Sequence, residues 1–187
     1  MSKSRTLLTV LTSLSILLAC FAVPAQKRQR RPVKRAPVTP APVVAEINTE
    51  ALVALLKRES DKPLLVNFWA TYCDPCREEF PDLVKIDTDF RSRGLDFVTV
   101  SLDDLQDIKT KVPQFLQQMR ATMPAYLLNV PDPEPAINAV DPKWQGDLPA
   151  TILYTPSGAI AFKHFGRVNA DELRSAIEKL LASNKGQ

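Results

Sequence analysis

Hydrophobic residues follow two different spacings along the chain from about residue 45 onward. Short, nearly continuous apolar runs at 63–69 and 95–101 are typical of strands that are buried on both faces. Elsewhere apolar residues recur at every third or fourth position, which predicts amphipathic helices. The clearest helical stretch carries Ile108, Val112, Phe115, Leu116 and Met119.

Strands and helices are therefore expected to alternate. The predicted order is a helix carrying Leu52, Leu55 and Leu56, a strand at 63–69, a helix at 76–91, a strand at 95–101, a helix ending near Met119, a short strand at 126–128, strands at 150–154 and 159–165, and a last helix carrying Leu173, Ile177, Leu180 and Leu181. Alternation predicts parallel pairing, and the compact turn at 155–158 predicts an antiparallel hairpin. We expect an α/β fold with a mixed central β-sheet and helices on both faces. The Pro- and Asp-rich stretch 129–147 is expected to be an irregular excursion over the surface.

The first 25 residues have the pattern of a targeting segment. Two basic residues precede an apolar run at 7–23, which small residues follow. A secretory signal has this order. Three outcomes stay open: lipidation of Cys20 in a lipoprotein-like box, ordinary cleavage after Ala25, and an uncleaved membrane anchor.

Charge is distributed unevenly between the two ends of the chain. The whole chain has 24 Lys and Arg against 21 Asp and Glu, but the first 35 residues hold eight basic residues and no acidic one, so the remainder carries a net charge of −5. An acidic domain is a poor candidate for binding nucleic acid. Residues 26–46 are predicted to be a disordered, basic, Pro-rich linker, either solvated or resting on anionic lipid, and 47–187 the folded domain.

Three cysteines and a single histidine limit the metal and haem chemistry that is open to this chain. One histidine excludes a multi-histidine zinc site, and three cysteines are too few for a disulfide scaffold. A c-type haem attachment needs His directly after the second cysteine of a pair, but Arg77 stands there. A peroxidatic cysteine needs Thr or Ser three residues before it, where this chain has Ala70. We expect neither a metal nor a cofactor.

Cys73 and Cys76 form a Cys-x-x-Cys pair at a predicted strand-to-helix junction, in the sequence FWATYCDPCREEFP. This is the expected position of a redox dithiol. Cys73 would lie at a helix N-terminus, where free N–H groups favour the nucleophilic thiolate. Cys76, one turn later, can resolve the mixed disulfide that forms with a partner. Pro75 suits the first helical turn because it has no N–H to leave unpaired.

The sequence around this pair resembles the thioredoxin superfamily, in particular its TlpA/ResA-like branch of membrane-tethered thiol–disulfide oxidoreductases. The resemblance extends over residues 45–183. It is carried by VNFWATYCDPCREEFPDL at 66–83, VTVSLDD at 98–104, DLPATILYTPSGAI at 147–160 and the late Gly166. A thioredoxin-like fold is what the resemblance implies.

The resemblance also implies how a substrate is held. Pro149 would be the cis-proline that faces the cysteines. The main chain of Leu148 would pair with an extended substrate peptide. Trp69, Tyr72 and Pro75, around the cysteines, would contact the substrate as well.

Several residues depart from the thioredoxin pattern. Asn67 stands where thioredoxins carry a buried aspartate that handles protons. Asp74, between the cysteines, is then the candidate for proton relay, or else only caps the helix. Glu78 and Glu79 are expected to be solvated charges. Trp144 either lines the peptide groove or anchors its loop.

We therefore expect a thiol–disulfide oxidoreductase that works without a cofactor. The resemblance implies reduction of protein disulfides in the bacterial cell envelope, in the periplasm or at the outer face of the cytoplasmic membrane, with a membrane thiol carrier as electron donor. The alternatives are a thiol oxidase or isomerase on the same fold, and a non-catalytic periplasmic binding module. Attachment to the membrane would use the N-terminal segment or a lipid on Cys20.

Overall fold

In the computed structural model, which describes residues 42–184, strands and helices alternate along most of the chain. In chain order they are β1 (Val44–Ile47), α1 (Thr49–Leu56), β2 (Leu64–Trp69), α2 (Asp74–Phe90), β3 (Asp96–Ser101), α3 (Lys111–Met119), β4 (Ala125–Leu128), α4 (Glu134–Val140), β5 (Ala150–Tyr154), β6 (Ile160–Phe165) and α5 (Ala170–Asn184). Short 3-10 turns follow α2 and β3, at Arg91–Arg93 and Leu105–Asp107.

The strands form one mixed sheet in the order β1-β4-β3-β2-β5-β6. The first four strands of this order are parallel, β5 is antiparallel to β2, and β6 is antiparallel to β5. The mixed sheet and the final hairpin agree with the sequence prediction. Because parallel strands end at the same edge of a sheet, the loops after β2, β3 and β4 meet there, which is where α/β proteins bind their ligands.

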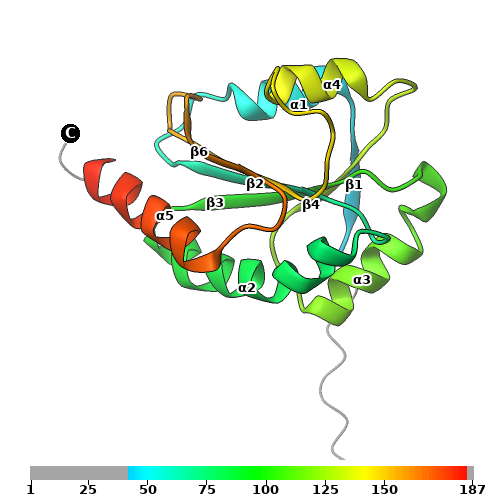
Figure 1. Cartoon of the computed structure of the whole chain (residues 1–187), viewed down its shortest axis with the longest axis horizontal. Coiled ribbons are helices and arrows are strands. Elements are labelled where there is room, and N and C mark those ends of the chain that lie inside the picture. The colour runs from blue at the N-terminus through cyan, green and yellow to red at the C-terminus, as the bar shows by residue number, and fades with distance from the viewer. Residues whose placement is uncertain (1–41, 185–187) are drawn as a thin grey trace, which may run out of the picture. The chain divides into compact units, whose positions relative to one another are not determined.

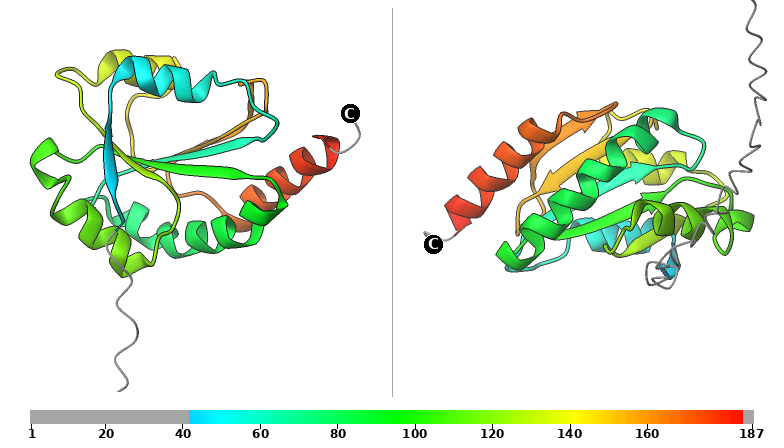
Figure 2. Two further views of the ribbon diagram at one scale, coloured as in Figure 1. Left: turned by 180° about the vertical axis from the view of Figure 1, so that it is seen from behind. Right: turned by 90° about the horizontal axis from the view of Figure 1, so that it is seen from below.

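Helices cover both faces of the sheet (Figure 1). α1 and α4 lie together on one face, while α2, α3 and α5 lie on the other, and the two views in Figure 2 show the same layers from behind and from below. The predicted helices on both faces are confirmed.

Successive side chains of β2 point alternately into the two hydrophobic cores, one on each face of the sheet. Leu65 and Trp69 belong to the core under α2, α3 and α5, while Leu64, Val66 and Phe68 belong to the core under α1 and α4. Every residue of β2 is buried. A central strand covered on both sides has this nearly continuous apolar sequence, because successive side chains point to opposite faces.

Two sequence predictions about the fold are wrong. The linker was expected to reach residue 46, but Val44–Ile47 is a strand that pairs in parallel with β4. The stretch 129–147 was expected to be irregular, but it contains α4, which buries Ala136 and Val140 against the sheet. Each segment is too short to show a period and acquires its structure from the partner that it packs against.

The targeting segment, Cys20 and residues 26–41 of the predicted linker lie outside the described residues. Within 42–184, no helix combines the length and the apolar character that crossing a membrane requires.

Candidate active site

The loop between β2 and α2 carries the cysteine pair to the carboxyl edge of the sheet. The Leu102 N–H, just after β3, donates to the Trp69 carbonyl at the end of β2 (2.8 Å), so the two strands still hold each other where they end. The chain then turns, and the Cys73 N–H donates to the Ala70 carbonyl (3.2 Å). This turn sets Cys73 directly before the first residue of α2.

Cys73 and Cys76 are joined by a disulfide, with their Cα atoms 5.3 Å apart. Cys73 is the N-cap residue of α2, and its Sγ accepts a hydrogen bond from the Cys76 N–H (3.2 Å). Cys73 is 8% exposed and Cys76 is fully buried. Of the two residues only Cys73 keeps any exposed surface, and the helix N-terminus stabilises negative charge at the Cys73 sulfur.

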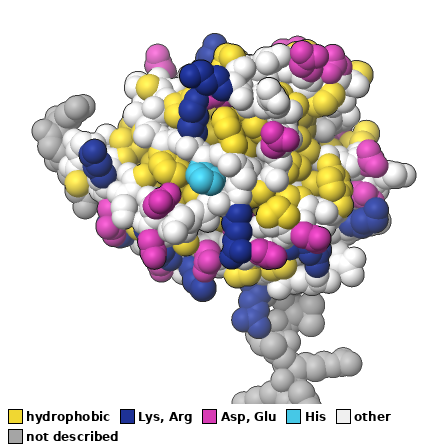
Figure 3. Space-filling model, in the orientation of Figure 1, with side chains coloured by type: hydrophobic (Ala, Val, Ile, Leu, Met, Phe, Trp, Pro, Cys, Tyr) yellow, Lys and Arg dark blue, Asp and Glu magenta, His cyan; other side chains and the backbone are white. Residues whose placement is uncertain are grey.

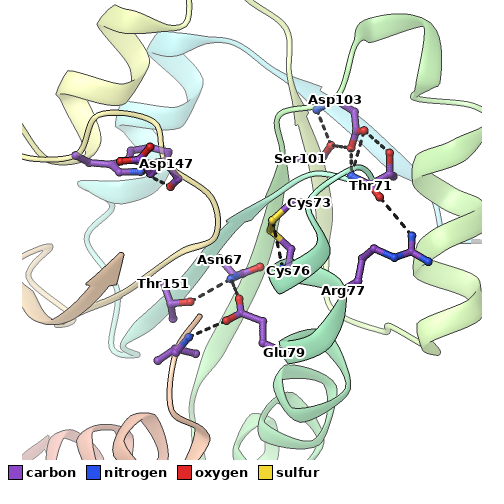
Figure 4. Close-up of a disulfide and its surroundings, with 12 residues drawn as sticks. Asn67, Thr71, Cys73, Cys76, Arg77, Glu79, Ser101, Asp103, Asp147 and Thr151 are labelled. Carbon is purple, nitrogen blue, oxygen red and sulfur yellow. Dashed lines mark hydrogen bonds between the residues drawn. A yellow bond between two sulfur atoms is a disulfide. The ribbon is translucent and has the colours of Figure 1, made fainter. Parts of the chain in front are cut away.

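Asp103 holds the loop that precedes the cysteines (Figure 4). Its buried carboxylate accepts hydrogen bonds from the Thr71 N–H (2.9 Å), from the Thr71 hydroxyl and from the Ser101 hydroxyl (2.6 Å). Hydrogen bonds to a charged acceptor are stronger than those between neutral groups. The end of β3 thus fixes the backbone two residues before Cys73.

A second buried carboxyl group lies beside Cys76 on the sheet side of α2 (Figure 4). Glu79 is only 2% exposed. Its Oε1 accepts a hydrogen bond from the Asn67 side-chain amide (3.0 Å), and its Oε2 accepts one from the Val168 N–H (2.8 Å). The same Asn67 Nδ2 donates to the Thr151 hydroxyl on β5 (3.1 Å). Strand β2, helix α2, strand β5 and the segment before α5 therefore meet at this carboxyl group.

Burial changes the acidity of Glu79. Loss of hydration raises the pKa of its carboxyl group to about 7, although the hydrogen bonds from Val168 and Asn67 and the charge of Arg167 act in the opposite direction. The desolvation cost prevails because it penalises the charged form directly. A carboxyl group with this pKa exchanges a proton readily near neutral pH.

The Leu148–Pro149 peptide bond, just before β5, is cis. Ala150 pairs with Phe68 near the end of β2, so this bond lies at the same edge of the sheet as the cysteines. No main-chain hydrogen bond of Leu148 to another described residue is present. Within 42–184 its N–H and carbonyl are therefore unpaired.

Trp144 anchors the loop that leads to this bond. It is 3% exposed, its ring centroid lies 4.8 Å from that of Phe68, and its indole N–H donates to the Asp147 carbonyl (2.8 Å). Of the two roles that the sequence left open for Trp144, the buried anchor is the one that the structure supports.

The structure corrects two expectations about site residues. Trp69, expected to contact the substrate, is fully buried and packs against Phe80 and Phe115. Its position on β2 turns it toward α2 and away from solvent. Glu79, expected to be a solvated charge, is buried because it lies on the face of α2 that packs against the sheet. Tyr72 is 71% exposed, and Asp74 and Pro75 are also at the surface.

Sequence reasoning missed the burial of two acidic residues near the cysteines, which the pattern could have revealed. Glu79 interrupts the apolar stripe of α2 that runs through Cys76, Phe80 and Leu83, and a carboxyl group in such a stripe points into the core. Asp103 follows β3 at the ligand-binding edge of the sheet. The described residues contain no cluster of side chains suited to a metal ion.

Comparison with known proteins adds a family and a set of relatives. The model of the AhpC/TSA family matches residues 37–163. The chain is 29% identical over 120 residues to the thiol-disulfide oxidoreductase ResA of Oceanobacillus iheyensis, an alignment that spans 64% of this chain and 57% of that protein. It is 23% identical over 188 residues to ResA of Bacillus cereus, spanning 96% and 99% of the two chains.

The alignment with a third relative, ResA of Halalkalibacterium halodurans, spans 65% of that protein. The chain therefore spans less than two thirds of the length of the Oceanobacillus and Halalkalibacterium proteins. Among solved structures, a thiol:disulfide interchange protein of the thioredoxin family from Chlorobium tepidum superposes with a TM-score of 0.57 at 25% identity, over 79% of this chain and 99% of that one. The expected thioredoxin-like fold is confirmed.

Proposed function

The chain belongs to the AhpC/TSA family, and on this basis we propose that it is a thiol–disulfide oxidoreductase that reduces disulfides of other proteins. Its relatives named ResA and its structural neighbour from Chlorobium tepidum are named for this kind of activity. A peroxidatic cysteine needs Thr or Ser three residues before it, and this chain has Ala70 three residues before Cys73. Within the family, this difference favours disulfide exchange over peroxide reduction.

One observation carries the proposal: the two residues of the Cys73–Cys76 disulfide lie in different surroundings. Cys73 caps a helix and keeps a small exposed surface, 8%, whereas Cys76 is fully buried one turn later. A purely structural disulfide gains nothing from this difference and closes too small a loop to stabilise much. A dithiol that attacks with one sulfur and resolves with the other requires it.

The reaction begins from the reduced pair. The Cys73 thiolate attacks one sulfur of the substrate disulfide, a mixed disulfide forms, and the other substrate sulfur leaves as a thiolate that takes up a proton. The Cys76 thiol then loses its proton and attacks the Cys73 sulfur. The Cys73–Cys76 disulfide forms, the second substrate thiolate leaves and is protonated, and two electrons have passed to the substrate.

We assign Glu79 as the base that accepts the proton of the Cys76 thiol. The two residues are three apart on α2 and so share one face of the helix. A carboxyl group with a pKa of about 7 accepts a proton from a thiol far more readily in a buried site than water does there. Asp74, the candidate from the sequence, lies at the surface on the first residue of α2.

Substrate binding is proposed at the surface around Cys73. The free main chain of Leu148 would pair with an extended peptide, and Pro149 would set its direction. Tyr72 and Pro75 present exposed side chains beside the nucleophile. On the face shown in Figure 3, hydrophobic side chains gather in the centre and most charged ones lie along the margin, as is common where proteins bind other proteins.

The proposed location is the cell envelope, in the periplasm or at the outer face of the cytoplasmic membrane. The apolar segment at 7–23 supports export, and the basic residues that follow it support contact with an anionic membrane surface. The proposed electron donor is a thiol carrier in the membrane, because a dithiol that works outside the cytoplasm must receive electrons from another protein to be reduced again. Lipidation of Cys20 remains part of this proposal.

The test uses two single substitutions in the pre-reduced protein. Cys73→Ser should abolish reduction of a model protein disulfide, because the accessible nucleophile is lost. Cys76→Ser should instead accumulate a mixed disulfide with the substrate, which mass spectrometry detects. If Cys73→Ser keeps activity within twofold of the wild type, the proposal is wrong.

The direction of electron flow follows from the reduction potential of the pair. A reductant should equilibrate with thiol buffers near the value of thioredoxin, about −270 mV, whereas a strong oxidant lies near about −120 mV. A potential close to the second value would replace the reductase proposal by the oxidase alternative.

A further inference from the structure

A cleft of about 400 Å³ opens directly beside the exchange site. On one side it is bordered by Tyr72, the neighbour of Cys73, and on the other by Gln145 and Gly146, which lead to the Leu148–Pro149 bond. A peptide held between Cys73 and Leu148 would therefore place its flanking residues in this cleft. Tyr72 and Gly146 thus connect the lining of the cleft, along the chain, to the two ends of the proposed substrate site.

The lining of the cleft is about equally polar and apolar. Tyr72 and Leu105 belong to the few large hydrophobic side chains in 42–184 that are strongly exposed, at 71% and 44%. The remaining apolar lining residues are Leu102, Leu128, Val130, Pro133 and Ile137. These apolar residues favour an aliphatic chain, including the methylene stem of a long charged residue.

The charge of the cleft has a single sign. Its lining includes Asp103 and Asp104 and no Lys, Arg or His. Asp103 is buried and engaged by Thr71 and Ser101, whereas the exposed Asp104 carboxylate has no hydrogen bond or ion pair with another described residue. Lys111, which is not part of the cleft lining, pairs with Asp107 and also interacts electrostatically with Asp103 and Asp104. Burial raises the pKa of the Tyr72 hydroxyl, and the negative charges of Asp103 and Asp104 raise it further.

We propose that this cleft selects protein disulfides flanked by Lys or Arg: the aliphatic stem would lie against Leu105 and the cation between the Tyr72 ring and the Asp104 carboxylate. An aromatic face and a free carboxylate both attract a cation, and the apolar lining residues exclude part of the water that would screen it. The inference rests on the proposed exchange activity and adds a substrate class to it.

The experiment compares peptides that differ only beside the disulfide. Each peptide contains one disulfide whose reacting cysteine is flanked by Arg, by Gln or by Glu. Pre-reduced full-length protein reacts with each in a single turnover, and thiols are trapped by alkylation and separated. Each rate is divided by the rate at which dithiothreitol reduces the same peptide, which removes differences in intrinsic reactivity.

The wild-type protein should reduce the Arg peptide about tenfold faster than the Glu peptide. Arg would be attracted to Tyr72 and Asp104 and Glu would be repelled by them, and a tenfold ratio corresponds to a difference of roughly 1.4 kcal/mol. The preference should shrink at high salt. Asp104→Lys should bring the ratio to about one or reverse it, because the free carboxylate becomes a cation.

Asp61→Lys is the matched control. Asp61 is also exposed and unpaired among the described residues, but it precedes β2 and so lies at the opposite edge of the sheet. It should keep the wild-type ratio. An equal effect of both substitutions, or equal wild-type rates with all three peptides, would overturn the inference.

Hydroxyethyl disulfide, a small disulfide without charge, distinguishes a wrong substrate class from a wrong proposed function. Wild-type protein that reduces it without discriminating among the peptides would refute only the substrate class. Wild-type protein that reduces neither it nor any of the three peptides would refute the exchange activity, and the substrate class with it.

Discussion

Glu79 and Asp74 are two carboxyl groups on the same helix in opposite environments. Asp74 is exposed on the first residue of α2, while Glu79 is enclosed between α2 and the sheet and receives hydrogen bonds from Asn67 and Val168. Because Asn67 is neutral, the Glu79 carboxyl group has no second acidic side chain at this position with which to share its proton. The environment of Glu79 therefore makes it the residue whose titration should govern the resolving step.

Substitution of Glu79 by Gln should remove a pH dependence from that step. In the wild-type protein, the rate at which Cys76 resolves the mixed disulfide should rise through pH about 7 as Glu79 becomes able to accept a proton. Glu79→Gln should lose this inflection and be slower above it by about a hundredfold. Rapid quenching with acid over a range of pH values measures the step.

Asp74→Asn is the comparison variant and should retain the inflection. The reverse pattern, an inflection that survives in Glu79→Gln and disappears in Asp74→Asn, would return the proton relay to Asp74.

At the scale of elements, the segment between α4 and β5 is anchored by Trp144. Trp144 joins this segment to Phe68 on β2 and to Phe165 on β6, whose ring centroids lie 4.8 and 6.4 Å from its own. Its indole N–H holds the Asp147 carbonyl just before Leu148. Trp144 thus helps to fix the Leu148 main chain, together with the packing of the Leu148 side chain against both cores.

Trp144→Phe should lower the free energy of unfolding and weaken peptide binding together. The ring contacts are largely kept, but loss of the hydrogen bond to Asp147 should cost about 1 kcal/mol. Since the Leu148 main chain is then less fixed, KM for a peptide disulfide should rise severalfold, while kcat/KM for a small disulfide should change little. Urea unfolding and steady-state kinetics measure the two effects.

Trp69→Phe is the matched control, because the Trp69 indole N–H is buried without a hydrogen-bond partner among the described residues. It removes the same atoms and no hydrogen bond. An identical change of KM in both variants would contradict the anchoring role of Trp144.

For the molecule as a whole, the raised pKa of Glu79 couples stability to pH. The carboxyl group titrates near 4.5 in an unfolded chain and at about 7 in the folded one. Between these values the folded state holds the proton more tightly, so deprotonation favours unfolding. Stability from this group is complete below about 4.5 and is lost as the pH rises to about 7.

The free energy of unfolding should therefore fall, relative to that of Glu79→Gln, by at most about 3 kcal/mol across this interval. Urea unfolding of the oxidised wild-type and variant proteins at several pH values measures the difference, because all other groups titrate equally in both. A difference that stays constant with pH would show that Glu79 is already charged in the folded protein.

The sequence alone determined the class of the fold and the position of the reactive pair. β2 is nearly all apolar because it is buried on both faces, and α3 repeats its hydrophobic positions at helical spacing. Both patterns are local, so they can be recognised without a partner. The same holds for Cys73 and Cys76, whose spacing and position at the end of an apolar run predict a redox dithiol.

Only the tertiary structure decided which side chains surround that pair. The contact of Glu79 with Asn67 joins a helix to a strand, and the exposure of Tyr72 and burial of Trp69 depend on which face each neighbour covers. β1 and α4 are likewise stable because β4 and α1 lie beside them. Burial and proton affinity are properties of a packed environment, and distant segments of the chain create that environment when they meet.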